Sequence, residues 1–288
     1  MKSICPVDLP ILEALALFFP ESSKTNLRSW IKEGRISVDG MAIKSTTHQV
    51  SKGQRIALGT KPYIVEGLVP ILYEDKHFVV IDKPVGLLSV STAFEKTETA
   101  FGYLKRKYYP RPVYVVHRLD QDTSGVMLFA LSTDGLNGLK EIFEKHDLTR
   151  QYVAIVEGQV PKEAGTWESY LVEDRQYVVK STQDRTKGEL AITHYRVDAT
   201  AKGYSLMSLT LETGKKNQIR VHCQEAGHPV AGDKKYGSKG SPIKRLCLHA
   251  HLLAFNHPIT GKPMRFVSPV PTAFYQLVRL PKERSAGK

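Results

Sequence analysis

Two carboxylates stand close together in one polar loop of the chain. Asp120 and Asp122 lie between the apolar runs 113–116 and 126–131, which are typical of strands. A loop between two strands presents its side chains on a rigid scaffold, where catalytic residues are common. The pair could supply a general acid and base, as in glycosidases, or the loop could be a turn that bonds its own backbone. The residues alone leave both interpretations open.

Metal binding is a third interpretation, and the spacing argues against it. The loop starts like a calcium-binding EF-hand at Asp120, but Leu131 stands at the twelfth position, where a bidentate Glu is required. Cys247, His249 and His251 alternate as ligands on one face of a strand could. The paired Cys or His spacing of zinc sites is absent, so we predict no metal site.

The composition predicts a globular protein with a polyanionic partner. Of 288 residues, 41% are hydrophobic, and the net charge is +12, which favours nucleic acid or an anionic membrane surface. The apolar run 11–19 carries Glu13 and stops at Pro20, short of the roughly 18 residues of a membrane span. Three widely spaced cysteines indicate no disulfide framework, so we predict a cytoplasmic location.

The first 60 residues have a pattern of their own. A helix is expected at 9–19, and a second helix begins after Ser22 or Ser23 and ends at Gly34. The Asp-Gly pair at 39–40, between two short apolar runs, predicts a type I′ hairpin. The segment therefore reads as a small α/β module.

One face of the second helix carries a stripe of cations. A solvated helix face is the plainer interpretation, but the net charge of +12 favours contact with RNA. The helix order, Gly34 and the hairpin resemble an S4 RNA-binding module. We therefore predict an S4-like module at 1–60, and a second, larger domain at 61–288 that carries the loop with the two carboxylates. The stripe consists of Lys24, Arg28, Lys32 and Arg35, spaced by four, four and three residues.

Strands outnumber helices in the rest of the chain. They do not alternate regularly with helices, which predicts an α+β domain with a large mixed or antiparallel sheet flanked by helices. A helix capped by Asn217 is expected at 217–226, and another amphipathic helix around 136–143. The expected strands are 78–81, 113–116, 126–131, 152–156, 192–197 and 204–211.

The carboxylate loop also carries a specific signature. Residues 117–120 read His-Arg-Leu-Asp, and residues 123–125 read Thr-Ser-Gly. This pattern resembles the signature of the RluA-type family of pseudouridine synthases, and the likeness spans about 69–271. Asn217 departs from the pattern, because a His is usual there. Further segments that resemble the family lie at 71–75, 83–87, 150–152, 213–222, 227–237 and 248–258.

The resemblance implies an enzyme that isomerises uridine within RNA. Uracil is detached from the ribose at N1 and reattached through C5, and no cofactor is needed. Asp120 is implied as the nucleophile, Tyr152 as the residue that faces the base, and Arg220 as the cation that keeps Asp120 ionised. Without the resemblance, Tyr152 reads as a core aromatic and Arg220 as a surface residue.

The resemblance also indicates where RNA is bound. A base in a helix must be flipped out of its stack, and His117 and Arg118 are placed to stack on the RNA or fill the vacated site. Thr123 belongs to the same predicted group. The alternative for His117 is a strand-end residue satisfied by the backbone. Large-subunit ribosomal RNA is the favoured substrate and transfer RNA the alternative, for a monomer without a membrane partner. A non-catalytic RNA-binding protein is the competing function.

Overall fold

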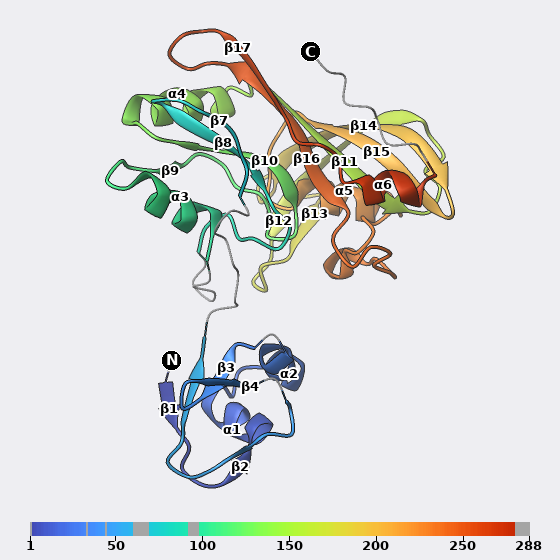
Figure 1. Cartoon of the computed structure of the whole chain (residues 1–288). Coiled ribbons are helices and arrows are strands. Elements are labelled where there is room, and N and C mark those ends of the chain that lie inside the picture. The colour runs from blue at the N-terminus through green and yellow to red at the C-terminus, as the bar shows by residue number, and fades with distance from the viewer. Residues whose placement is uncertain (1, 33, 44, 60–68, 92–97, 280–288) are drawn as a thin grey trace. The chain divides into compact units, whose positions relative to one another are not determined.

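The computed structural model describes residues 2–32, 34–43, 45–59, 69–91 and 98–279 (Figure 1). It divides into two compact units, Met1–Glu66 with Ser91–Thr99, and Gly67–Val90 with Ala100–Lys288. The linker that the sequence suggests at 59–70 and the polar tail at 282–288 fall largely outside the described residues. Within those residues no helix has the length and apolarity to cross a membrane.

The first unit packs two helices against small antiparallel sheets. Leu9 and Pro10 pair with a strand, so the first helix begins two residues later than predicted. The backbone of a residue before proline disfavours the helical region, which explains the late start. The helices are α1 (Ile11–Phe18) and α2 (Lys24–Lys32), and the strands are β1 (Lys2–Ile4), β2 (Leu9–Pro10), β3 (Ile36–Val38), β4 (Met41–Ile43), β5 (Gln49–Val50) and β6 (Arg55–Leu58). The four-stranded sheet has the order β1-β6-β3-β4.

Local signals in this unit act as the sequence predicts. Ser23 Oγ accepts a hydrogen bond from the backbone N–H of Asn26 at 3.3 Å, at the start of α2. Gly34 ends the helix in the left-handed region, with φ +68°. Asp39 and Gly40 both have positive φ, at +49° and +86°, as a type I′ turn requires. The predicted helix end and hairpin are therefore confirmed.

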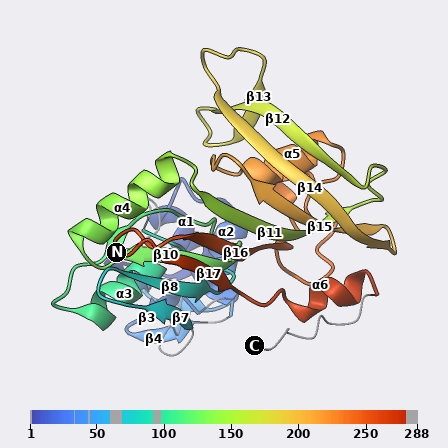
Figure 2. The same cartoon turned by 90° about the horizontal axis from the view of Figure 1, so that it is seen from above.

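The second unit is built on a mixed sheet, which counts 11 strands among the described residues (Figure 2). Its order is β13-β12-β14-β15-β11-β16-β10-β8-β7, with β17 beside β16 and β9 beside β10. β10 and β16 are parallel, and the other pairs are antiparallel. The predicted α+β class is confirmed. The strands are β7 (Ile71–Glu74), β8 (Phe78–Lys83), β9 (Tyr114–Val115), β10 (Ser124–Ala130), β11 (Leu148–Glu157), β12 (Ala164–Glu173), β13 (Val179–Thr182), β14 (Glu189–Ala201), β15 (Tyr204–Leu211), β16 (Leu248–Asn256) and β17 (Pro263–Val267).

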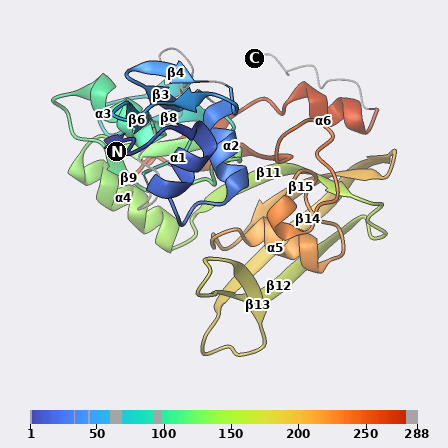
Figure 3. The same cartoon turned by 90° about the horizontal axis from the view of Figure 1, so that it is seen from below.

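Helices lie at both ends of this sheet. Figure 2 shows α3 (Ala100–Tyr108) and α4 (Thr133–Glu144) with the β7–β10 half of the sheet. In the view from below, α5 (Gln218–Glu225) lies with β12–β15 in the other half, and α6 (Thr272–Leu277) lies near β15 (Figure 3). The sequence did not predict α3, α6, β12 or β13. β12 is mostly half-buried or exposed, so it has no continuous apolar run to signal a strand.

The close approach of β10 and β16 fixes the start of β10. All seven residues of β10 are buried, and Gly125 pairs with Ala250 of β16. Gly125 has φ +115°, and a Cβ on it would lie 2.1 Å from the Ala250 carbonyl oxygen. Only glycine fits there. The loop that holds Asp120 is thereby set against β16.

Gly125→Ala should destabilise the protein far more than Gly203→Ala. Both glycines have positive φ, but a Cβ at Gly203 would meet nothing within 4 Å. Gly203→Ala should therefore cost only the backbone strain, about 1–2 kcal/mol, whereas Gly125→Ala adds a backbone clash and should at least double that cost. Urea unfolding measures both. Equal losses of unfolding free energy for the two variants would show that the backbone at the β10–β16 contact can move apart at little cost.

Candidate active site

A buried lysine holds the loop that carries Asp120. Lys83, at the end of β8, is fully buried. Its ammonium donates to the carbonyl oxygens of Pro84, Leu87 and Gln121 at 3.1, 2.7 and 3.0 Å. Burial lowers the pKa of Lys83 to about 7, while the carboxylates of the loop oppose that shift. The Lys83 side chain thus connects the loop that follows β8 to the loop that carries Asp120.

A serine fixes the residue immediately before Asp120. Ser89 Oγ donates to the Leu119 carbonyl at 2.6 Å and accepts from the Leu119 N–H at 3.1 Å. On the other side, the Thr123 N–H donates to the Asp120 carbonyl at 3.1 Å and closes a turn. The backbone at Asp120 is therefore held from both directions, which keeps its carboxylate in one place.

Two side chains of one segment converge on the Asp120 carboxylate. Arg220 Nη1 donates to Asp120 Oδ2 at 2.9 Å, and Asn217 Nδ2 donates to the same oxygen at 2.6 Å. The Asp120 side chain is 29% exposed, so it remains open to a substrate. The guanidinium thus sets a fixed positive charge against one oxygen of the carboxylate.

Arg220 is itself held by a second carboxylate. Its Nε and Nη2 donate to Asp233 Oδ2 and Oδ1 at 2.6 and 2.8 Å, a bidentate pair. The Asp233 side chain is only 1% exposed. Burial lowers the pKa of Arg220, but the hydrogen bonds and charges of Asp233 and Asp120 outweigh it and raise that pKa overall. The guanidinium also lies 4.8 Å from the ring centre of Tyr236.

Asn217 has a different role from the one that we predict. It stands at the N-cap position of α5, in the left-handed conformation with φ +54°, and its side chain makes no cap hydrogen bond. The amide instead turns to Asp120, and its Oδ1 accepts from the Tyr236 hydroxyl at 3.2 Å. Asn217 is therefore the N-cap residue by position, as predicted, but its side chain does not cap the helix. A side-chain cap would need Oδ1 as the acceptor of a backbone N–H, and that oxygen accepts from Tyr236 instead.

Tyr152 lies on β11 at an irregularity of the sheet. It pairs with Leu209 of β15 and Ala250 of β16, and the register with β16 shifts between Gln151 and Tyr152. Burial raises the pKa of Tyr152 to about 12, and the charge of Asp120 adds to the shift. Tyr152 is therefore a neutral phenol at neutral pH, able to donate a hydrogen bond or stack on a base.

The three predicted RNA-contacting residues of the loop have different surroundings. His117 Nε2 accepts from the Leu128 N–H at 3.1 Å, and its ring stacks on Phe143 at 4.9 Å. Burial lowers the pKa of His117 to about 3, so the ring is neutral. This geometry favours the alternative of a residue satisfied by the backbone. Thr123 is 2% exposed, whereas Arg118 is open to solvent.

The histidines considered for zinc are engaged elsewhere. His249 Nδ1 hydrogen-bonds Ser124 Oγ at 2.8 Å, and His251 Nδ1 hydrogen-bonds the Ser268 carbonyl at 2.8 Å. Among the residues that the structure describes, no three His, Cys, Asp or Glu side chains gather as metal ligands.

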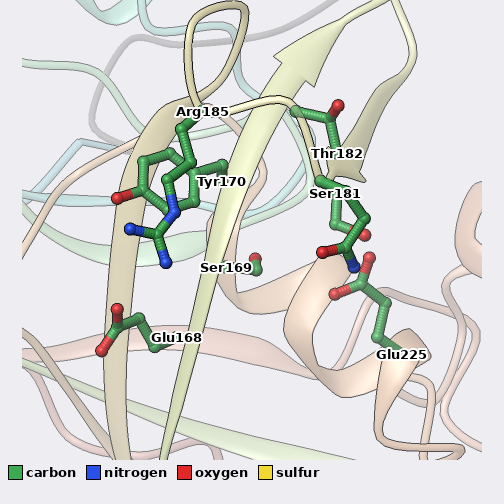
Figure 4. Close-up of a pocket in the computed structure, with 8 residues that line it drawn as sticks. Glu168, Ser169, Tyr170, Ser181, Thr182, Arg185 and Glu225 are labelled. Atoms are coloured by element: carbon green, nitrogen blue, oxygen red, sulfur yellow. The ribbon is translucent and has the colours of Figure 1, made fainter.

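A separate cavity of about 360 Å³ lies between β12, β13 and the end of α5 (Figure 4). It is lined by neither Asp120, Tyr152 nor Arg220. Its lining carries two carboxylates, Glu168 and Glu225, and one guanidinium, Arg185, so its charge does not favour a phosphate backbone. The cavity is therefore not part of the site at Asp120.

Comparison with solved structures identifies the class of fold. The chain is similar to the structure entitled Human RNA Pseudouridylate Synthase Domain Containing 4, with a TM-score of 0.60 and 25% identity over 74% of this chain and 94% of that one. It shares its fold with Human RNA Pseudouridylate Synthase Domain Containing 1, with a TM-score of 0.60 and 23% identity over 73% of this chain and 86% of that one. Both titles name an RNA pseudouridylate synthase domain, so this chain has the fold of that class.

Sequence comparison gives the family. The model of the RNA pseudouridylate synthase family matches residues 77–225, which include Asp120, Tyr152 and Arg220. The chain is 34% identical to ribosomal large subunit pseudouridine synthase D of Xylella fastidiosa, over 94% of this chain and 88% of that protein. The identity to the Neisseria meningitidis serogroup B protein of that name is 32%, over 92% of this chain and 76% of that protein. The chain belongs to the RNA pseudouridylate synthase family, whose members isomerise uridine to pseudouridine in RNA.

Asp233→Ala should destabilise the fold much more than Asp120→Ala. Loss of Asp233 removes two hydrogen bonds from a guanidinium that is 14% exposed, and breaking a buried ion pair costs about 3–5 kcal/mol. Asp120→Ala leaves the Arg220–Asp233 pair intact and should cost about 1 kcal/mol. Thermal unfolding of the two variants measures this difference. A larger loss for Asp120→Ala would contradict the assignment of Asp233 as the anchor.

Proposed function

We propose that this chain converts specific uridines of large-subunit ribosomal RNA to pseudouridine, with Asp120 as its nucleophile. The observation that carries the proposal is the ion pair between Asp120 and Arg220 at 2.9 Å, inside the segment that matches the family. The relatives named ribosomal large subunit pseudouridine synthase D support the substrate. Transfer RNA is the alternative substrate.

The two donors on Asp120 suggest which oxygen reacts. Arg220 and Asn217 both bond Oδ2, so Oδ1 is the oxygen that faces the substrate. In the reaction the bond between C1′ and N1 breaks, uracil turns, and a bond forms between C1′ and C5. N1 gains a proton and C5 loses one, so the product is an isomer. The Asp120 carboxylate can attack the substrate at the start of this sequence, and the hydrogen bond from Arg220 holds it in place.

Tyr152 is proposed to face the uracil ring. Its phenol can stack on the base while it turns, and donate a hydrogen bond to a carbonyl of the base. With a pKa of about 12, the phenol stays protonated at neutral pH and cannot accept a proton before the substrate binds. Removal of the C5 proton by Tyr152 therefore requires a bound substrate that lowers this pKa.

RNA is proposed to contact both units of the chain. Arg118, exposed beside Asp120, can fill the space that a flipped base leaves. In the first unit Lys24, Arg28 and Lys32 are exposed along α2. Arg35 is half-buried and lies 5.4 Å from the ring centre of Trp30. The exposed cations support an S4-like, phosphate-binding face on the first unit.

We infer a cytoplasmic monomer that needs no cofactor. The three cysteines are buried free thiols, which suits a reducing compartment. The product is an isomer of the substrate, so the reaction needs no donor of electrons or of a chemical group. The residues of this chain can therefore carry it out alone.

A gene deletion in the host tests the function and finds the substrate. Carbodiimide labelling followed by reverse transcription maps pseudouridine as stops. Specific stops in large-subunit ribosomal RNA should disappear in the deletion and return with the wild-type gene. Asp120→Ala should not restore them, because it removes the nucleophile.

A control separates catalysis from RNA binding alone. The Asp120→Ala protein should bind the same RNA as the wild type with similar affinity. Full recovery of the stops by Asp120→Ala would refute the assignment of the nucleophile. Unchanged stops in the deletion, with no turnover of unmodified transcripts by purified protein, would favour a non-catalytic RNA-binding protein.

A further inference from the structure

Tyr177 is an exposed aromatic residue in the turn between β12 and β13. It is 62% exposed and has φ +60°, in the left-handed region that is unfavourable for a non-glycine residue. The turn is shaped by Asp174 Oδ1, which accepts from the backbone N–H groups of Gln176 and Val178 at 2.9 Å each. A large ring is therefore presented to solvent from a turn with a defined shape.

Two lysines from other elements meet this residue. Lys216 Nζ lies 5.9 Å from the centre of the Tyr177 ring. Lys235 Nζ donates to the Tyr177 carbonyl at 3.0 Å. Both lysines are exposed. Lys216 also pairs with Glu173, but partly exposed pairs contribute little, so a phosphate can replace that carboxylate.

This cluster of Tyr177, Lys216 and Lys235 borders the active site. Lys216 directly precedes Asn217, which bonds Asp120. Lys235 directly precedes Tyr236, whose ring lies against the Arg220 guanidinium. Consecutive Cα atoms are about 3.8 Å apart, so both lysines lie beside the groups that hold the carboxylate. Figure 2 shows β12, β13 and α5 side by side in this part of the sheet.

We propose that Tyr177, Lys216 and Lys235 form a subsite for an unpaired nucleotide next to the target uridine. The base stacks on the Tyr177 ring, and the lysines bind the flanking phosphates. Exposed aromatic rings combined with cations are the means by which proteins hold single-stranded RNA. The inference rests on the proposed function, since it names further contacts of the same RNA at the same site.

Stacking is tested by comparing two probes of equal length. One is a 12-nucleotide oligouridylate, and the other is its abasic ribose-phosphate analogue. Tyr177→Gly keeps the left-handed turn but removes the ring, and should weaken oligouridylate binding about fivefold or more. Tyr177→Phe should bind like the wild type. The abasic probe should bind all three proteins equally.

Two results would overturn the stacking role. One is oligouridylate affinity unchanged in Tyr177→Gly. The other is an equal loss for both probes, which would mean that the variant disturbs the fold or the charge. Melting temperatures of the three proteins check the fold independently.

The lysines are tested through the salt dependence of binding. Replacing Lys216 and Lys235 together by Gln should reduce the slope of log K against log salt by about 1.4, at roughly 0.7 per contact with a single strand. Lys262→Gln is the matched control, because Lys262 is exposed in the turn between β16 and β17. An unchanged slope in the double variant would refute the phosphate contacts.

The subsite and the proposed function can be tested independently of each other. Probe binding does not require turnover, so the cluster can fail while the enzyme still isomerises uridine. With saturating RNA, Tyr177→Gly should keep the single-turnover rate and raise only the RNA concentration needed. A lower rate at saturation would assign Tyr177 to the chemical step and contradict the subsite.

Discussion

The arginine between two carboxylates is the interaction on which the site depends. Arg220 is mostly buried, and a lone guanidinium in that position would carry a large desolvation cost. Asp233 offsets this cost with two hydrogen bonds and fixes the plane of the guanidinium. The remaining nitrogen, Nη1, is thereby directed at Asp120. A lysine could not reproduce this, because only the planar fork reaches both carboxylates at once.

The sheet brings these groups together from distant parts of the chain. The Asp120 loop precedes β10, Tyr152 lies on β11, and β16 runs between the two strands. The tight contact between Gly125 of β10 and Ala250 of β16 fixes how closely these two strands approach each other. α5 adds Arg220 from the other half of the sheet.

Local chemistry made much of the fold predictable. The hairpin at Asp39 and Gly40 depends on two positive φ angles that few residues adopt, so two letters were enough to predict it. Strand β15 matches its predicted range, because apolar residues recur along its whole length, at 204, 206, 207, 209 and 211. β12 and β13 were missed because most of their residues are half-buried or exposed and form no apolar run that would signal a strand.

The site was predictable only in part. The signature of the loop pointed to Asp120, and the structure brings Arg220 to it. Asp233 lay in a segment that resembles the family, but nothing in its neighbours indicated that it holds an arginine. Asn217 was read as a cap because its position fits one, whereas the choice between the helix and a distant carboxylate is decided by tertiary structure. His117 accepts a hydrogen bond from the Leu128 N–H, and this contact is likewise decided by tertiary structure.

The most direct measurement is tritium release from RNA labelled at C5 of uridine, since that hydrogen leaves during isomerisation. We would compare the wild type with Arg220→Lys on a large-subunit ribosomal RNA transcript, with RNA affinity measured in parallel. The account predicts that Arg220→Lys binds RNA normally and releases tritium about 100-fold more slowly, because Asp120 loses its fixed partner. Release at the wild-type rate would contradict the central role of the Arg220 bridge.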